Sequence, residues 1–185
     1  EFYKRTNIIC SKILEITKNE NNQILLLSER ISLLKDIEKK IKDKVSYGYF
    51  VGGMKPEERE ESMSKKVILA TFHIAREALD IKSLNTLILA TPKSDIVQAV
   101  GRILREKHDN HLIIDIVDNF SSFANQAKRR LTYFRKKNYN ITSYEVDDEG
   151  KILDSYEDDY NQKCTNKKNN NKKNKKEGPL FSFFN

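Results

Sequence analysis

A chain of 185 residues can bury one ordinary hydrophobic core, so we expect one domain with appendages. The formal net charge of +7 is uneven, because a basic first part precedes a tail that is acidic and then rich in lysine. Cys10 and Cys164 fit no disulfide framework, which favours a reducing intracellular setting. No apolar run could cross a membrane and no signal-peptide pattern opens the chain, so we expect neither a membrane-spanning nor a secreted protein.

The hydrophobic pattern predicts alternating strands and helices after a leading amphipathic helix at about residues 6–19. The expected strands are 23–27, 45–50, 66–71, 86–90 and 111–116, and the expected helices are 29–44, 56–62, 95–105 and 120–137. Several strands are apolar on both faces, which is typical of a parallel sheet covered by helices on each side. We therefore predict a doubly wound α/β fold that binds its ligands at the carboxyl ends of the strands.

The helix at 95–105 carries a chemically unusual surface. Its expected buried stripe consists of Ile96, Val97, Val100, Ile103 and Leu104. Gln98, Arg102 and Arg105 lie on the opposite face, and Gly101 removes bulk beside them. Guanidinium groups match phosphoryl oxygens, so a triphosphate is the natural ligand. Taken alone, the same pattern also fits an ordinary solvated surface helix.

The segments upstream favour the phosphate interpretation. A strand ends in Thr71, the segment 72–81 follows it, and a second strand at 86–91 leads into the arginine helix. Together these segments resemble motifs V and VI of superfamily 2 helicases. Residues 24–28 resemble the motif IV strand, and residues 51–54 resemble the glycine-containing motif IVa. The resemblance covers residues 20–140 and implies a RecA-like domain of an ATP-driven motor acting on DNA or RNA.

The resemblance implies roles for individual residues. Arg102 and Arg105 would be catalytic arginine fingers that reach the γ-phosphate of ATP bound on a neighbouring domain. The implied nucleotide-binding residues are Gln98, Gly101 and Asp80, and the implied nucleic-acid-binding residues are Ser28, Gly53 and Thr71. ATP with Mg²⁺ is the implied cofactor. Thr71, Asp80 and the glycine pair at 52–53 also fit a strand-end cap, a loop residue and a turn.

The sequence contains no GxxxxGK[ST] phosphate loop, and its histidines show no metal-ligand spacing. We therefore expect no metal site here and no ATP hydrolysis by this fragment alone. Residues 1–20 would lead from a missing first RecA-like domain of the same polypeptide, and residues 21–143 would form the second motor domain. The alternative is a non-hydrolysing accessory module that binds nucleic acid.

The last expected helix is basic at residues 128–130 and 135–137, around Tyr133 and Phe134. One interpretation is a phosphate-binding patch with stacking aromatic rings. The other is a solvated helix face with Leu131 and Phe134 packed inward. This helix and residues 138–146 resemble helicases of large nucleocytoplasmic DNA viruses, which implies a viral protein acting in the nucleus, cytoplasm, viral factory or virion.

The tail is expected to be a disordered linker at 144–176, acidic and then rich in lysine and asparagine. Residues 177–185 resemble a PIP-box, the short motif that binds sliding clamps. Leu180, Phe183 and Phe184 would then fill the clamp pocket. The alternative is an apolar end that packs back on its own domain.

Overall fold

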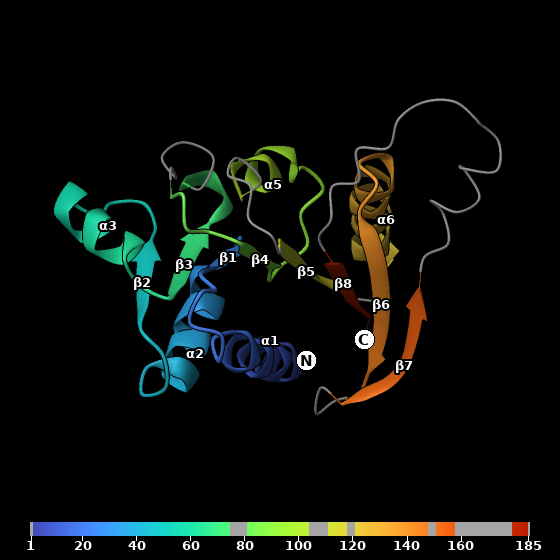
Figure 1. Ribbon diagram of the computed structural model, residues 1–185, viewed down its shortest axis with the longest axis horizontal. Coiled ribbons are helices and arrows are strands. Elements are labelled where there is room, and N and C mark those ends of the chain that lie inside the picture. Colours follow the sequence, from blue (N-terminus) through green and yellow to red (C-terminus); the bar gives the residue numbers. More distant parts are fainter. Residues whose placement is uncertain are drawn as a thin grey trace.

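The computed structural model describes residues 2–74, 81–103, 111–117, 121–147, 151–157 and 179–184, which form one sheet flanked by helices (Figure 1). Within these residues the strand order is β2-β3-β1-β4-β5-β8-β6-β7. The strands are β1 (Ile24–Ser28), β2 (Tyr47–Phe50), β3 (Val67–Thr71), β4 (Thr86–Leu89), β5 (Leu112–Val117), β6 (Asn140–Val146), β7 (Ile152–Glu157) and β8 (Pro179–Phe184). The helices are α1 (Phe2–Ile16), α2 (Ile31–Ile41), α3 (Pro56–Met63), α5 (Val97–Ile103) and α6 (Ser121–Lys136).

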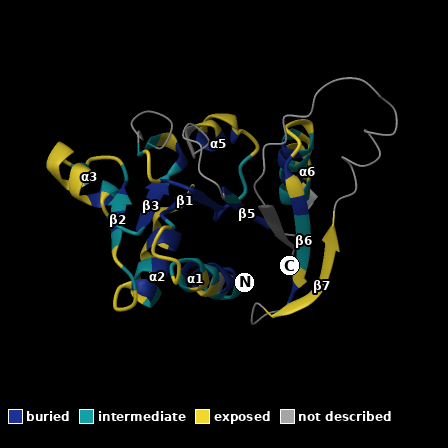
Figure 2. Ribbon diagram, in the orientation of Figure 1, coloured by how far each residue is buried: buried dark blue, intermediate teal, exposed yellow. Residues whose placement is uncertain are grey.

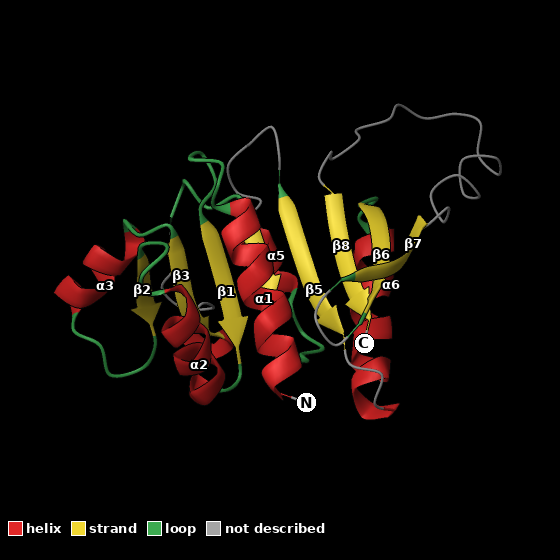
Figure 3. Ribbon diagram, turned by 90° about the horizontal axis from the view of Figure 1, so that it is seen from below, coloured by secondary structure: helices red, strands yellow, loops and turns green. Residues whose placement is uncertain are grey.

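Each neighbouring pair in this order is parallel except the last, because β7 runs antiparallel to β6. Helices α1 and α2 cover one face of the sheet, whereas α5 and α6 cover the other (Figures 1 and 3). Alternate residues of β1, β3 and β4 enter the cores on the two faces, so these strands are buried on both sides. The predicted doubly wound α/β fold is confirmed.

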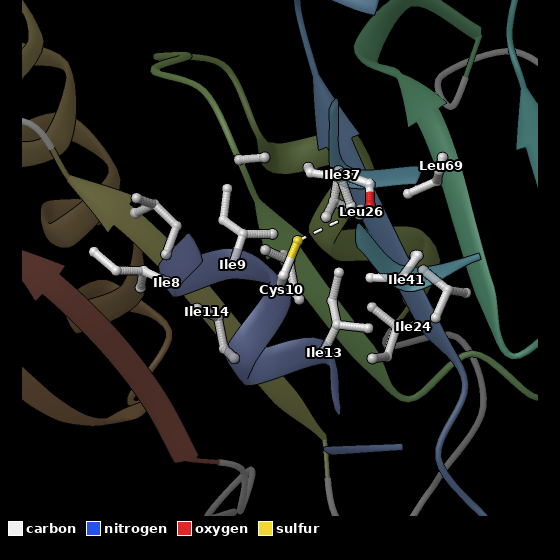
Figure 4. Packing of buried hydrophobic residues seen from close by; sticks show 14 of the residues in the cluster. Ile8, Ile9, Cys10, Ile13, Ile24, Leu26, Ile37, Ile41, Leu69 and Ile114 are labelled. Atoms are coloured by element: carbon white, nitrogen blue, oxygen red, sulfur yellow. Dashed lines mark hydrogen bonds between the residues drawn. The ribbon is translucent and has the colours of Figure 1, made fainter. Parts of the chain in front are cut away.

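The core beneath α1 and α2 is built largely from aliphatic side chains (Figure 4). Ile9 and Ile13 of α1 meet Ile37 of α2 and Leu26 of β1, and all four are fully buried. Burying each such side chain contributes about 1.5–3 kcal/mol. Cys10 lies in the same cluster, and its Sγ donates to the Ile37 carbonyl at 4.0 Å. Burial raises the pKa of the Cys10 thiol to about 11.

Part of the expected disordered linker is a β-hairpin. Residues 142–146 of β6 pair with 152–157 of β7, and a bulge lies between Glu145 and Val146. Strand β7 is exposed along its whole length (Figure 2). Low hydrophobicity predicts disorder, but backbone hydrogen bonds to a neighbouring strand can hold a polar segment at the margin of a sheet. Residues 158–178 of the expected linker lie outside the described residues.

The end of the chain supplies another strand. Residues 179–184 form β8, which pairs in parallel with β5 on one side and with β6 on the other. The expected free clamp-binding tail is therefore not supported, because Leu180, Phe183 and Phe184 stand at paired positions within the sheet. The alternative of an end that packs back on its own domain accounts for this pairing. An apolar strand and a PIP-box have similar composition, so the sequence did not separate them.

Gly48 allows α3 to approach the edge strand β2 closely. A Cβ added at Gly48 would lie 2.6 Å from both the Cα and the Cβ of Ser62. Ser62 is buried, and its hydroxyl donates to the Glu58 carbonyl at 2.8 Å. Because one obstructing atom belongs to the backbone, a side chain at position 48 must push α3 away from the sheet.

We expect Gly48→Ala to lower the free energy of unfolding by about 1–3 kcal/mol, as overpacking does in other cores. Gly52→Ala is a matched control, because its added Cβ would have no neighbour within 4 Å and its φ is not positive. Urea unfolding of both variants checks this prediction. Equal free energies of unfolding would contradict it.

We expect iodoacetamide at pH 8 to spare Cys10 in the folded protein and to label it in urea, because alkylation needs an accessible thiolate. Folding raises the pKa of this thiol from 9.0 to about 11. Its contribution to stability is therefore complete below pH 9 and is lost as the pH rises toward 11. Peptide mass mapping checks the labelling, and rapid modification of folded protein would count against this burial.

Candidate functional site

The carboxyl ends of β1, β2, β3 and β4 lie together at one edge of the sheet, because these strands are parallel and in register. Ser28 at the end of β1 pairs with Thr71 at the end of β3. We call the loops that leave these strands the carboxyl edge, made of residues 28–30, 51–54, 71–74 and 90–96. The edge therefore gathers Ser28, Gly53 and Thr71, which were predicted to bind nucleic acid.

Ser28 is fully buried, and its hydroxyl is used within the chain. The hydroxyl accepts the Arg30 N–H at 2.9 Å and donates to the Arg30 carbonyl at 2.9 Å, which turns the chain into α2. The Glu29 N–H also stays inside the domain, because it donates to Thr91 Oγ1 at 2.9 Å. Ser28 thus shapes the loop, and a role in binding nucleic acid stays a prediction.

Gly53 and Thr71 are more accessible. Gly53 is exposed with φ of +83°, in the left-handed region that favours glycine, and a Cβ there would have no neighbour within 4 Å. Thr71 is half-buried at the end of β3 and is followed by the buried Phe72. A role of either residue in binding nucleic acid stays a prediction.

Helix α5 presents a polar surface above a buried one. Ile96, Ala99 and Val100 are buried against the core, whereas Gln98 and Gly101 are exposed. Val97 corrects the predicted apolar stripe, because it is 51% exposed and Ala99 takes the inward position. The backbone of Arg102 lies in α5. Arg105 and Asp80 lie outside the described residues.

The loop between β4 and α5 is bonded to the loop after β1. Lys93 Nζ forms an ion pair with Glu29 Oε1 at 2.7 Å, and the same ammonium lies 5.8 Å from the centre of the Phe72 ring. Thr91 accepts the Glu29 amide as described above. These contacts connect segments that follow β1, β3 and β4.

A buried ion pair holds the same loop from beneath. Arg130 of α6 is 1% exposed, and its Nε donates to Asp115 Oδ2 of β5 at 2.8 Å. Arg130 Nη1 also donates to the Lys93 carbonyl at 2.7 Å. Burial raises the pKa of Asp115, and the charges of Arg130 and Arg5 oppose that shift. Arg5 of α1 donates to the Ala90 carbonyl, so two guanidinium groups bond the backbone of this loop.

Both interpretations of the basic last helix are wrong for Arg130, which is buried and paired within the domain. The inward packing expected of Leu131 and Phe134 is confirmed. Phe134 is fully buried and packs edge-on against Tyr133 and Tyr139, so it cannot stack on a base. A signal for the ion pair was available: Asp115 interrupts an otherwise apolar strand, and a buried carboxylate needs a charged partner. The sequence could not say which basic residue supplies that partner.

Within the described part of the chain, no helix is long and apolar enough to cross a bilayer. Those residues also contain no group of three or more histidine, cysteine, aspartate or glutamate side chains placed to hold a metal ion.

Residues 5–107 match the family model described as the helicase conserved C-terminal domain. This stretch includes β1 to β4, the carboxyl edge and α5. The chain belongs to this family. The match confirms the predicted superfamily 2 helicase resemblance.

Viral helicases are among its relatives. A protein of Acanthamoeba polyphaga mimivirus named "Putative ATP-dependent RNA helicase" is 37% identical over 152 residues, which cover 78% of this chain and 29% of that protein. A protein of African swine fever virus with the same description is 30% identical over 94 residues, which cover 49% of this chain and 18% of that protein. The chain thus spans less than a third of these two relatives.

Solved structures agree on the fold. The chain resembles T4 UvsW with a TM-score of 0.59 and 18% identity, over 72% of this chain and 33% of that one. It resembles the Escherichia coli DEAD-box protein SrmB with a TM-score of 0.55 and 14% identity, over 70% of this chain and 80% of that one. These similarities support the RecA-like architecture of the helicase domain.

We expect Arg130→Met to lower the free energy of unfolding by about 3–5 kcal/mol, because it leaves the Asp115 charge buried without its partner. The double variant Asp115→Leu/Arg130→Met should recover most of that loss, since it removes both charges. Arg129→Met, at an exposed position on the same helix, is the control. Urea unfolding at pH 7 checks the series, and a double variant no more stable than Arg130→Met would refute the ion-pair account.

Proposed function

We propose that this chain is the second motor domain of an ATP-dependent RNA helicase or translocase. In this proposal the first RecA-like domain of the same polypeptide holds ATP and Mg²⁺, and hydrolysis occurs between the two domains. The helicase family of the chain and the names of its viral relatives support the proposal. RNA is favoured over DNA because those names specify RNA helicases.

The orientation of α5 carries the proposal. Ala99 and Val100 face the core, while Gln98 and Gly101 face outward beside the carboxyl edge. In the sequence, Arg102 directly follows Gly101 and Arg105 is four residues after Gly101. We propose that Arg102 and Arg105 stabilise the charge that develops on the transferred phosphate, and that Gln98, Gly101 and Asp80 contact the nucleotide.

The rest of the carboxyl edge would bind the nucleic-acid backbone. Gly53 offers an open approach, Thr71 offers a hydroxyl at the end of β3, and Ser28 fixes the loop after the neighbouring strand β1. Neutral groups of this kind can grip a phosphate backbone without reading bases, as a moving enzyme requires. Closure of the two domains around ATP and their reopening after product release would move this grip along the strand.

We expect Arg105→Ala in the full-length helicase to reduce RNA-stimulated ATP hydrolysis by orders of magnitude, because arginine fingers contribute roughly 10³–10⁵ in rate in other phosphoryl-transfer enzymes. ATP turnover with and without single-stranded RNA is the measurement. Arg129→Ala, at an exposed arginine of α6, is the matched control and should keep full turnover.

Equal turnover of Arg105→Ala and the unmodified protein would remove Arg105 from the mechanism. If a folded, RNA-binding protein gave no turnover at all, the accessory-module alternative would replace the motor. Replacing single-stranded RNA with single-stranded DNA in the same assay tests the choice of nucleic acid.

A further inference from the structure

The ion pair between Glu29 and Lys93 connects the two parts of the carboxyl edge to which different tasks are proposed. Glu29 directly follows Ser28 at the end of β1, on the nucleic-acid side. Lys93 lies in the loop that leads into α5, on the ATP side. Their charged atoms are 2.7 Å apart, and both side chains remain partly exposed.

Two further contacts join the same loops. The Glu29 N–H donates to Thr91 Oγ1 at 2.9 Å, so the backbone and the side chain of Glu29 both bond the same loop. The Lys93 ammonium also lies 5.8 Å from the centre of the Phe72 ring, next to Thr71. A shift of the chain after β1 or β3 therefore changes the position of Lys93.

The backbone of the loop between β4 and α5 is held by two arginine side chains. Arg130 donates to the Lys93 carbonyl at 2.7 Å, and Arg5 donates to the Ala90 carbonyl. Ile96, three residues after Lys93, is 1% exposed and joins the core beneath α5. Because both carbonyls are bonded and Ile96 is packed, the loop has a fixed connection to the start of α5.

We propose that Glu29 and Lys93 are positioning residues that couple nucleic-acid binding to the placement of the arginine helix. The inference rests on the proposed motor function and adds the residues that carry the coupling. A partly exposed ion pair contributes little to overall stability, so reversing one of its charges should leave the domain folded. Both residues act through the loop, and neither needs to touch ATP.

The test is a charge swap in the full-length helicase. The variants are Lys93→Glu, Glu29→Lys, the double variant Glu29→Lys/Lys93→Glu, and the conservative Lys93→Arg. For each, ATP turnover is measured without RNA and with saturating single-stranded RNA, and RNA affinity is measured by fluorescence anisotropy. We expect each single reversal to reduce RNA stimulation, the ratio of turnover with RNA to turnover without it, at least about fivefold, the lower end of typical coupling between sites.

The double variant should regain most of the stimulation, since it restores opposite charges across the loops. Lys93→Arg should keep the stimulation, since it leaves the positive charge in place. Lys65→Glu is the matched control: Lys65 pairs with Glu61 at 2.8 Å, and its side chain is 31% exposed, as is that of Lys93. That pair belongs to α3 and its end, away from the loop to α5, so its reversal should leave the stimulation intact.

The outcomes separate the two proposals. Normal stimulation in both single reversals would overturn the coupling role and leave the motor function standing. A loss of RNA affinity in Lys93→Glu that the charge swap does not repair would make Lys93 a direct phosphate contact, and would also overturn the inference. No turnover in the unmodified protein would overturn the motor function and the coupling with it.

Discussion

The guanidinium group of Arg130 fixes the relation between three parts of this domain. It bonds the Asp115 carboxylate in the centre of β5 and the carbonyl of Lys93 in the loop before α5, while its own backbone belongs to α6. A charge buried to this degree is tolerated only when its donors find acceptors in good geometry. The position of α6 relative to the sheet therefore depends on the position of the loop before α5. Neither can change without breaking a bond of Arg130.

The parallel sheet makes this arrangement useful. Parallel strands in register end at a common edge, so loops that are far apart in sequence become neighbours there. The side chains of the central strands are buried and mostly aliphatic, so they offer few groups that could bind a ligand. The loops carry the variation: a bare turn at Gly53, a hydroxyl at Thr71 and a charged contact at Glu29. A rigid sheet with different short loops would thus support the two binding tasks proposed for this domain.

The sequence predicted most of the architecture because its strongest signals are local. Apolar runs such as residues 67–70 and 87–89 are buried on both faces, and the buried residues of α2 follow the 3.6-residue period. Val97 escaped the prediction because its position at the start of α5 places it at the solvent margin of the stripe.

The failures concern contacts between distant residues. Arg130 looked like one of several surface cations, and only the fold reveals that it faces Asp115 across 15 residues. Similarly, no local pattern indicates that residues 179–184 enter a sheet beside β5, which precedes them by more than sixty residues. Of the candidate site, the sequence indicated the edge and the exposed face of α5, and it missed the side chains that hold them together.

The position of β8 has a consequence for how this domain is made. Both of its sheet partners, β5 and β6, precede it in sequence, so they leave the ribosome first and wait with unpaired edges. Open strand edges attract other chains during synthesis. The stretch at 161–176 that precedes β8 in the sequence is dominated by lysine and asparagine, and like charges of this kind disfavour association between unfolded chains. The sheet is therefore continuous only once β8 has been made, because β8 fills the position between β5 and β6.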